Sequence, residues 1–286
     1  MNQKLWTIKD ILDWGVEYFE KKQIESPRLN IELLTCKVLN LNRLDLYMKF
    51  DKPLNKNELT ELREYVKRRA ANEPLQYIIG DVEFYNRIYK VNKSALIPRP
   101  ETEKLIDQIV KENSNNKENI KTILDIGTGT GCIAISLDLE FPNSEVFAID
   151  ISDQALQLAQ ENADSLNSGV KFFNMNILEK IPKKKFDLIV TNPPYVSSID
   201  YKGLENELKN YEPDIALTDN SDGLNFYRRY AEIFNSILNS KGIAYLEIGY
   251  NQEDEIIKLF NQKEFIINKF KDDQGIYRII KLEKIN

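Results

Sequence analysis

From residue 122 to residue 190 the chain alternates between short apolar stretches and helical stretches, and this alternation restricts the fold more than any other feature. Strands are predicted at 122–126, 146–149, 170–173 and 186–190, with helices at 133–139 and 155–163. Successive βαβ units of this kind build a largely parallel sheet covered by helices on both faces. Further strands are predicted at 243–248, 265–268 and 277–282, and the turn at 272–275 suits antiparallel neighbours. The sequence therefore predicts an α/β fold.

The first 75 residues differ from the rest, because they show helical spacing and almost no strand signal. Thr7 is predicted to cap one helix, Pro27 to open a second after Ser26, and residues 59–70 to form another. That last helix ends in the basic run 67–69, which is either a solvated helix face or a contact for an acidic partner or RNA. We expect a helical domain at 1–75, a β-hairpin linker at 76–100 with β-like pieces at 76–80 and 88–91, and an α/β domain at 101–286.

Histidine is absent from all 286 residues, and the two cysteines, Cys36 and Cys132, lie far apart in the sequence. A zinc site, a disulfide framework and a histidine general base are therefore not expected, and no metal ligand is predicted. The formal charge of −6 argues against a surface built for duplex nucleic acid. No apolar run reaches the ~20 residues of a membrane span, and residues 1–7 lack a secretory apolar stretch, so we expect a cytoplasmic protein without membrane contact.

A glycine-rich turn follows the first predicted strand and leads into a helix; it consists of Gly127, Thr128, Gly129, Thr130 and Gly131. Glycines there let the backbone approach a cofactor closely, yet the turn fits neither the dinucleotide fingerprint nor the P-loop. Asp150 ends the second strand, where its carboxylate can accept hydrogen bonds from both ribose hydroxyls of a nucleoside. A nucleoside site without a pyrophosphate signature, in a chain without histidine, favours S-adenosylmethionine, whose sulfonium already activates its methyl group.

Asn192, Pro193, Pro194 and Tyr195 follow the apolar strand at 186–190. Proline offers a carbonyl but no amide hydrogen, and the residue before it is extended, so this stretch is a rigid edge of hydrogen-bond acceptors. A planar NH2 group can donate one hydrogen to the Asn192 side-chain oxygen and the other to the Pro193 carbonyl, while Tyr195 covers its face. The alternative is a proline turn that only closes the strand.

Together these motifs resemble those of class I methyltransferases that modify planar NH2 groups. More specifically, residues 76–80, 96–103, 211–213 and 247–249 resemble the PrmC/HemK family, the peptide chain release factor glutamine methyltransferases. The resemblance implies a Rossmann-like, S-adenosylmethionine-dependent sheet, joined by the hairpin to a small helical domain that recognises bacterial release factors. It implies methylation of the side-chain amide nitrogen of the glutamine in their Gly-Gly-Gln motif, with no nucleic-acid substrate.

The resemblance also implies roles for individual residues. Catalysis and substrate binding fall to Asn192, Pro193, Pro194 and Tyr195. Cofactor contacts fall to the turn Gly127–Gly131, Asp150, Asn192, Asn176 and Ile177. Family members often carry Asp where this chain has Asn176, which can both donate and accept, so adenine binding can survive while recognition of its amino group is weakened.

Several side chains have two interpretations. Ile177 either sandwiches the adenine or fills the core, and Asp125 either approaches the methionine end of the cofactor or only ends its strand. Arg99 and Glu101 either order the linker loop over the site or form an ion pair with each other. Phe84 either walls the glutamine pocket or packs in the hairpin.

Other functions stay open on the sequence alone. An adenine-specific nucleic-acid methyltransferase would use the same four residues on a base flipped out of its stack. A ribosomal-protein glutamine methyltransferase shares the chemistry, and a binding module without catalysis shares the fold.

Overall fold

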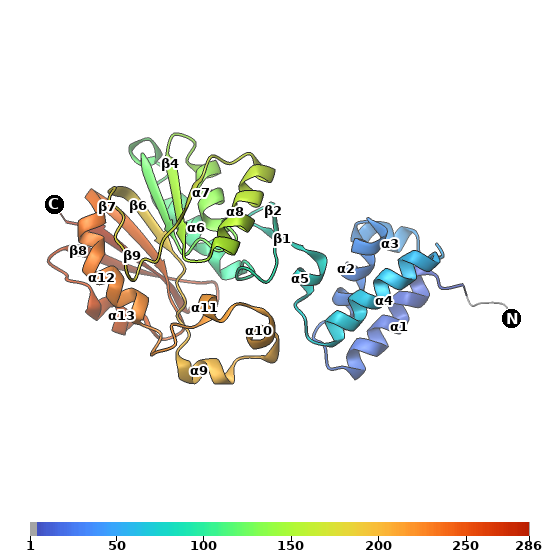
Figure 1. Ribbon diagram of the computed structural model, residues 1–286. Coiled ribbons are helices and arrows are strands. Elements are labelled where there is room, and N and C mark those ends of the chain that lie inside the picture. The colour runs from blue at the N-terminus through green and yellow to red at the C-terminus, as the bar shows by residue number, and fades with distance from the viewer. Residues whose placement is uncertain (1–4, 286) are drawn as a thin grey trace. The chain divides into compact units, whose positions relative to one another are not determined.

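The computed structural model describes residues 5–285, so the predicted domains 1–75 and 101–286 each extend past the described chain, at 1–4 and 286. The chain forms two compact units (Figure 1). The helical unit comprises the described residues up to Asp81 together with Asn206–Tyr211; the sheet unit comprises Val82–Glu205 and the described residues from Glu212 onward. Within residues 5–285, no helix combines the length and apolarity that crossing a bilayer requires.

The helical unit is a bundle whose apolar side chains meet in one core. Its helices are α1 (Ile8–Lys21), α2 (Pro27–Leu39), α3 (Arg43–Met48), α4 (Lys56–Ala70), α5 (Leu75–Ile79) and α10 (Asn206–Tyr211). The predicted caps are confirmed, because Thr7 and Asp10 form a reciprocal capping box at α1 and Pro27 stands in the first turn of α2.

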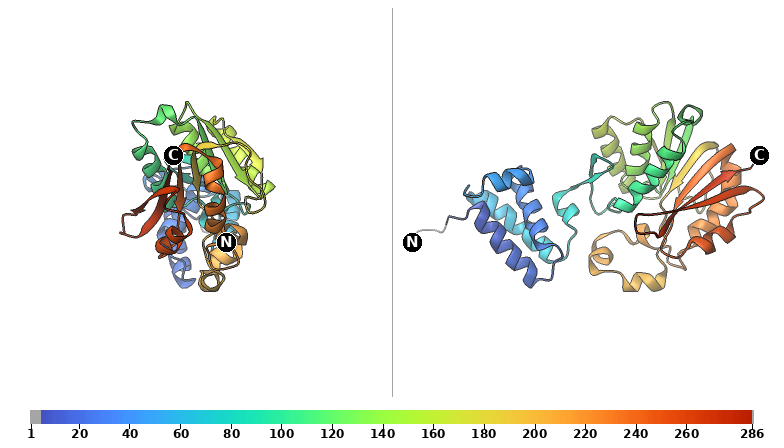
Figure 2. Two further views of the ribbon diagram at one scale, coloured as in Figure 1. Left: turned by 90° about the vertical axis from the view of Figure 1, so that its left-hand side faces the viewer. Right: turned by 180° about the vertical axis from the view of Figure 1, so that it is seen from behind.

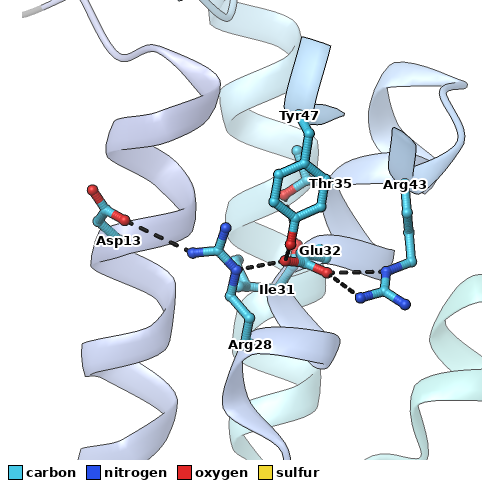
Figure 3. Close-up of polar contacts among 7 residues, drawn as sticks. All are labelled: Asp13, Arg28, Ile31, Glu32, Thr35, Arg43 and Tyr47. Atoms are coloured by element: carbon cyan, nitrogen blue, oxygen red, sulfur yellow. Dashed lines mark hydrogen bonds and ion pairs between the residues drawn. The ribbon is translucent and has the colours of Figure 1, made fainter. Parts of the chain in front are cut away.

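A buried carboxylate links three helices of this unit (Figure 3). Glu32 on α2 is 0% exposed and accepts hydrogen bonds from Arg28, from Arg43 on α3 and from the Tyr47 hydroxyl. Burial by itself would raise the pKa of Glu32, but the bonds from Tyr47, Arg28 and Arg43 together lower it. Arg28 also approaches Asp13 of α1, so one ionised carboxylate holds α1, α2 and α3 in register.

The basic run 67–69 at the end of α4 departs from expectation only in its last residue: the side chains of Lys67 and Arg68 are exposed, whereas Arg69 is neither solvated nor free for a partner. Its side chain is 8% exposed and donates to Asn30, to the Glu73 carbonyl and to Glu207 of α10. The Tyr211 hydroxyl donates to the Ala71 carbonyl from the other end of α10. A helix drawn from far along the sequence thus completes the unit.

The linker is only partly as predicted. Residues 76–80 were expected to be β-like, but α5 covers Leu75–Ile79 and ends at Gly80, whose φ is +87°. A hairpin does follow, with β1 (Asp81–Phe84), β2 (Arg87–Lys90) and a left-handed turn at Tyr85 and Asn86. Phe84 is 1% exposed and packs edge-on against Tyr89 in the core of the sheet unit, so its side chain packs rather than walling a pocket.

The sheet unit contains a seven-stranded sheet within the described residues, in the order β5-β4-β3-β6-β7-β9-β8. Its strands are β3 (Thr122–Ile126), β4 (Glu145–Asp150), β5 (Lys171–Asn174), β6 (Phe186–Thr191), β7 (Leu238–Glu247), β8 (Phe265–Lys271) and β9 (Tyr277–Lys284). The first five of these run parallel, while β9 runs antiparallel to both β7 and β8. Every predicted strand from residue 122 onward is confirmed.

Helices cover both faces of this sheet (Figures 1 and 2). One face packs against α6 (Pro100–Glu112), α7 (Cys132–Glu140) and α8 (Asp153–Leu166), and the other against α12 (Asn225–Ile237) and α13 (Glu253–Leu259). Alternate residues of each strand feed the two cores: Ile123 belongs to the first and Leu124 to the second. The connections also contain the 3-10 helix η1 (Lys117–Asn119) and the short helices α9 (Ser198–Gly203) and α11 (Asp214–Leu217).

Candidate active site

Strand register brings the predicted motifs to one edge of the sheet. Ile126, the last residue of β3, pairs with Ile149 of β4 on one side and with Thr191 of β6 on the other. These three paired residues are followed in the sequence by Gly127, Asp150 and Asn192, respectively. Chain order reverses between β4 and β6 around β3, and such a switch point is where an open parallel sheet forms its ligand crevice.

A cavity of about 290 Å³ lies at this edge, within the sheet unit. Most of the predicted site residues line it: Gly127, Thr128, Gly129, Thr130, Asp150, Asn176, Ile177, Asn192, Pro193 and Pro194. Gly131, Asp125 and Tyr195 do not line it. The sequence motifs therefore meet at one cavity, although these three residues are not part of its lining.

The glycine turn has a backbone that side chains would disturb. Gly127 has a φ of +77°, and a Cβ there would meet no atom within 4 Å, so its missing side chain leaves open space. Gly131 has a φ of +82°, and its Cβ would lie 3.1 Å from the Ala159 Cβ of α8. The first glycine keeps the cavity open and the second lets α7 pack against α8.

Asp150 is held in place by the backbone around it. Its Oδ2 accepts from the Gly129 amide at 2.9 Å, and its Oδ1 accepts from the Ser152 amide at 2.9 Å. Burial raises the pKa of Asp150, while the amides of Ser152 and Gly129 oppose that rise. Each carboxylate oxygen retains a lone pair, so both can accept a further hydrogen bond from a ligand.

Asn176 and Ile177 follow β5, whose last residue Asn174 pairs with Asp150 of β4, and both line the cavity. The Asn176 Oδ1 accepts from the Leu178 amide at 3.0 Å, an interaction that turns the chain locally. Ile177 is 5% exposed and belongs to the core on the α12 face, yet it also lines the cavity. The core interpretation of Ile177 is confirmed, while its contact with an adenine stays a prediction.

Asp125 lies at the base of the turn and is 0% exposed. Its Oδ2 accepts from the Thr128 hydroxyl at 2.7 Å, and its Oδ1 has no hydrogen-bond partner among the described residues. Burial raises its pKa to about 7, with Thr128 opposing and Asp150 reinforcing the rise. Asp125 therefore stabilises the glycine turn through its Oδ2, while its Oδ1 accepts no hydrogen bond from the described residues.

Three of the four residues from Asn192 to Tyr195 line the cavity: Asn192, Pro193 and Pro194. The Asn192 Nδ2 donates to the Thr102 hydroxyl at 3.2 Å. Tyr195 instead directs its hydroxyl to Glu247, 3.5 Å away, while its carbonyl accepts from Gln252. The expected stacking of Tyr195 on a substrate amide stays a prediction.

The linker loop before α6 is held by an ion pair other than the Arg99–Glu101 pair that one sequence interpretation proposed. Arg99 lines the cavity and pairs with Glu212, not with Glu101. The Glu212 side chain is 1% exposed and also accepts from the Ile97 amide at 3.1 Å. Glu212 therefore anchors the loop that carries Arg99 along the cavity wall.

Comparison with known proteins follows the two units. A family model described as the PrmC N-terminal domain matches residues 10–80, and one described as the methyltransferase small domain matches residues 102–207. A release factor glutamine methyltransferase from Geobacter sulfurreducens is 38% identical over 97% of this chain and 96% of its own length. The chain belongs to the release factor glutamine methyltransferase family. The predicted PrmC/HemK resemblance is confirmed.

Solved structures agree on the fold of this family member. A methyltransferase from Pyrococcus furiosus has a TM-score of 0.52 at 16% identity and covers 81% of this chain and all of that one. The T. thermophilus 16S rRNA N2 G1207 methyltransferase, in complex with AdoMet and guanosine, has a TM-score of 0.50 at 16% identity over 71% of this chain and 49% of its own. The predicted class I, Rossmann-like methyltransferase fold is confirmed.

Two buried residues of this family member were not predicted as part of the site. Thr102 on α6 and Glu247 at the end of β7 are each 3% exposed, and the Thr102 hydroxyl donates to the Glu247 Oε2 at 2.7 Å. Both lie in stretches that carried the family resemblance, at 96–103 and 247–249, and that was the available signal. Nothing in the sequence indicated that they touch each other or reach Asn192.

Proposed function

We propose that this chain transfers a methyl group from S-adenosylmethionine to the side-chain amide nitrogen of the glutamine in the Gly-Gly-Gln motif of bacterial release factors. One observation carries the assignment beyond the family: the register of Ile126 and Thr191 puts Asn192 on the same cavity as Asp150. An acceptor for an amide and a carboxylate for a ribose thus face one space. The relatives do not favour the adenine or ribosomal-protein alternatives.

The cavity residues fit the cofactor. Asp150 would hold the ribose through both oxygens, Gly127 leaves room for a ligand beside the backbone, and Asn176 and Ile177 would border the adenine. Asp125 would support the cofactor indirectly, because its Oδ2 accepts from the hydroxyl of Thr128, which lines the cavity. When bound, S-adenosylmethionine supplies an activated methyl group that needs no acid–base help to leave sulfur.

The protein's own contribution is to orient a weak nucleophile. An amide nitrogen reacts poorly because its lone pair is delocalised into the carbonyl. The Asn192 Oδ1 and the Pro193 carbonyl would each accept one amide hydrogen, which aligns the nitrogen and stabilises the positive charge that develops on it. Such alignment can lower a barrier by ~7–11 kcal/mol. The nitrogen then loses a proton to water, so no histidine is required.

We propose that nucleic acid is not a substrate and that the protein acts in the cytoplasm. The formal charge of −6 and the relatives named for release factors support the first statement. The same relatives support the helical unit as the part that recognises the release factor, since its family model covers residues 10–80.

The test is methyl transfer from labelled S-adenosylmethionine with four acceptors: a bacterial release factor, the same factor with the Gly-Gly-Gln glutamine changed to alanine, a ribosomal-protein mixture and nucleic acid. We expect label only in the intact release factor, mapped to the glutamine by mass spectrometry. Label in nucleic acid or ribosomal proteins alone would replace the proposal with the corresponding alternative. Absence of both label and cofactor binding by calorimetry would leave a non-catalytic binding module.

A further inference from the structure

A chain of side-chain hydrogen bonds runs from the cavity into the core of the sheet unit. The Asn192 Nδ2 donates to the Thr102 Oγ1 at 3.2 Å, and the Thr102 hydroxyl donates to the Glu247 Oε2 at 2.7 Å. The Tyr195 hydroxyl donates to the other carboxylate oxygen at 3.5 Å. Three segments that are distant in sequence, α6, the exit of β6 and the end of β7, therefore share one polar network.

The direction of these bonds is fixed by chemistry. An ionised carboxylate only accepts hydrogen bonds, so it takes the single hydrogen of Thr102. The Thr102 oxygen then has only lone pairs to offer, and they can bind Asn192 through its NH2 group alone. The Asn192 amide is thereby turned so that its oxygen remains for a ligand in the cavity. In this arrangement Glu247 determines whether the Oδ1 or the NH2 group of the Asn192 side chain is directed toward a substrate.

We propose that ionised Glu247 is a positioning residue that, through Thr102, sets the Asn192 side chain with Oδ1 toward the substrate amide. This inference rests on the proposed function, because the orientation matters only for a guest that donates hydrogen. With Glu247 neutral, its own hydroxyl can donate to Thr102, and the Thr102 hydrogen can turn to Asn192. The flipped Asn192 amide would then present NH2 groups to an NH2 substrate and repel it.

The surroundings of Glu247 make its charge sensitive to pH. Burial raises its pKa to about 7; Thr102, Arg278 of β9 and Tyr195 oppose the rise, and Glu101 of α6 reinforces it. No cation forms an ion pair with its carboxylate among the described residues within 4.0 Å.

Two further groups face Glu247 from neighbouring helices. Tyr227 of α12 donates to the Glu247 backbone carbonyl at 2.8 Å, and burial raises the pKa of Tyr227 well above its ordinary value. Cys132 of α7 also stays protonated, since burial raises its pKa to about 12. Neither group titrates near neutrality, so Glu247 is the member of this cluster whose charge changes there.

The first test removes the relay without changing its volume. Thr102→Val should lower kcat for release factor methylation by up to about 100-fold while leaving S-adenosylmethionine affinity near that of the wild type. Thr102→Ser keeps the hydroxyl and should restore most of kcat. Ser136→Ala in the sheet unit is the control, because it also removes a buried hydroxyl: Ser136 is 0% exposed, lies 3.0 Å from the Tyr89 hydroxyl and does not line the cavity. It should retain wild-type kcat.

The second test follows charge rather than volume. Wild-type kcat/KM should fall as pH drops below about 7, as Glu247 takes up a proton. Asp125 titrates in the same range, so only the part of the pH dependence that Glu247→Gln abolishes belongs to Glu247. The side-chain amide signals of Asn192 in an NMR titration should move with the same midpoint in the wild type and not in Glu247→Gln.

The outcomes separate the two proposals. If the wild type does not methylate the release factor, the proposed function is wrong. If the wild type methylates it and Thr102→Val is folded and fully active, the positioning role is overturned. Loss of activity in Thr102→Ser equal to that in Thr102→Val, or Asn192 amide signals insensitive to pH, would also overturn it.

Discussion

At the scale of single residues, Asn192 and Asp150 have different proposed roles in the site. Asp150 is the last residue of β4 and Asn192 directly follows β6, so both lie at the same edge of the sheet. Asn192 is neutral and owes its orientation to one donated hydrogen bond to Thr102. Asp150 is a carboxylate fixed by the amides of Gly129 and Ser152. The neutral Asn192 amide suits the alignment of a substrate group during the reaction, whereas the fixed Asp150 carboxylate suits the binding of a cofactor. Their substitutions should therefore affect different kinetic constants.

Asn192→Ala should lower kcat by roughly 100- to 1000-fold, the usual cost of removing one group that stabilises developing charge. Cofactor affinity should change little, because Asp150 and the glycine turn remain. Single-turnover methylation of a release factor and calorimetric titration of S-adenosylmethionine measure the two quantities. Near-normal turnover in Asn192→Ala would contradict the two-acceptor mechanism.

Asp150→Ala should instead weaken S-adenosylmethionine binding by roughly 10- to 100-fold, since hydrogen bonds to a charged acceptor are worth about 1.5–3 kcal/mol each. The Gly129 and Ser152 amides also lose their acceptor in this variant. Asp150→Asn is the matched control, because its carbonyl can keep one of those bonds, and its dissociation constant should lie between the other two. Equal affinity in all three proteins would remove Asp150 from the cofactor site.

At the scale of elements, the turn between β3 and α7 has to satisfy a cavity and a helix contact at once. Gly131→Ala should destabilise the protein by roughly 2–4 kcal/mol, because a left-handed alanine is strained and its Cβ would press on Ala159 and Ile135. Gly80→Ala has a similar φ of +87° but nothing within 4 Å, so only about 1–2 kcal/mol is expected. Urea unfolding of both variants measures the difference, and equal losses would show that contact with α8 is unimportant.

The elements that the sequence predicted well are those whose pattern is local. The strand at 122–126 coincides with β3, because an apolar run ending at a glycine turn indicates both its length and its end. The segment 76–80 failed for the opposite reason. Its β-branched residues favour a strand, but Ile78 is 4% exposed in the core of the helical unit and Gly80 accepts a left-handed helix end. Packing outweighed propensity.

The site shows the same division. The glycine turn, Asp150 and Asn192 were predictable because each directly follows a strand, and parallel strands end at one edge. The partners Thr102–Glu247 and Arg99–Glu212 are 145 and 113 residues apart, and no local pattern indicates such pairings. Local sequence patterns thus identified the residues that line the cavity better than the residues that form hydrogen bonds with them from distant parts of the chain.

At the scale of the whole molecule, the two units respond to pH in opposite directions. The pKa of Glu32 is lowered in the helical unit, so its contribution to stability is present above the ordinary carboxyl pKa and is lost as pH falls through its folded value. Asp125 and Glu247 have pKa values raised to about 7, so their contribution is greatest when both are protonated and is lost as pH rises toward about 7.

Raising the pH from about 5.5 to about 8 should therefore lower the protection of β3 amides and leave that of α4 unchanged. Hydrogen exchange read by mass spectrometry on the full chain, corrected for intrinsic rates, measures both units in one experiment. Asp125→Asn, which keeps an acceptor for Thr128, should reduce the loss in β3. A uniform loss across both units would show that the buried carboxylates do not govern the difference.

The placement of α10 affects the order in which the protein can be completed during synthesis. Arg69 is buried in the helical unit, and its carboxylate partner Glu207 lies 138 residues later in the chain. A ribosome makes the chain from its N-terminus, so Arg69 waits for its counter-charge until α10 has emerged, and by then most of the parallel sheet has been made. The N-terminal helices are synthesised first, yet their unit cannot be completed until α10 has been made, after β6 and before β7.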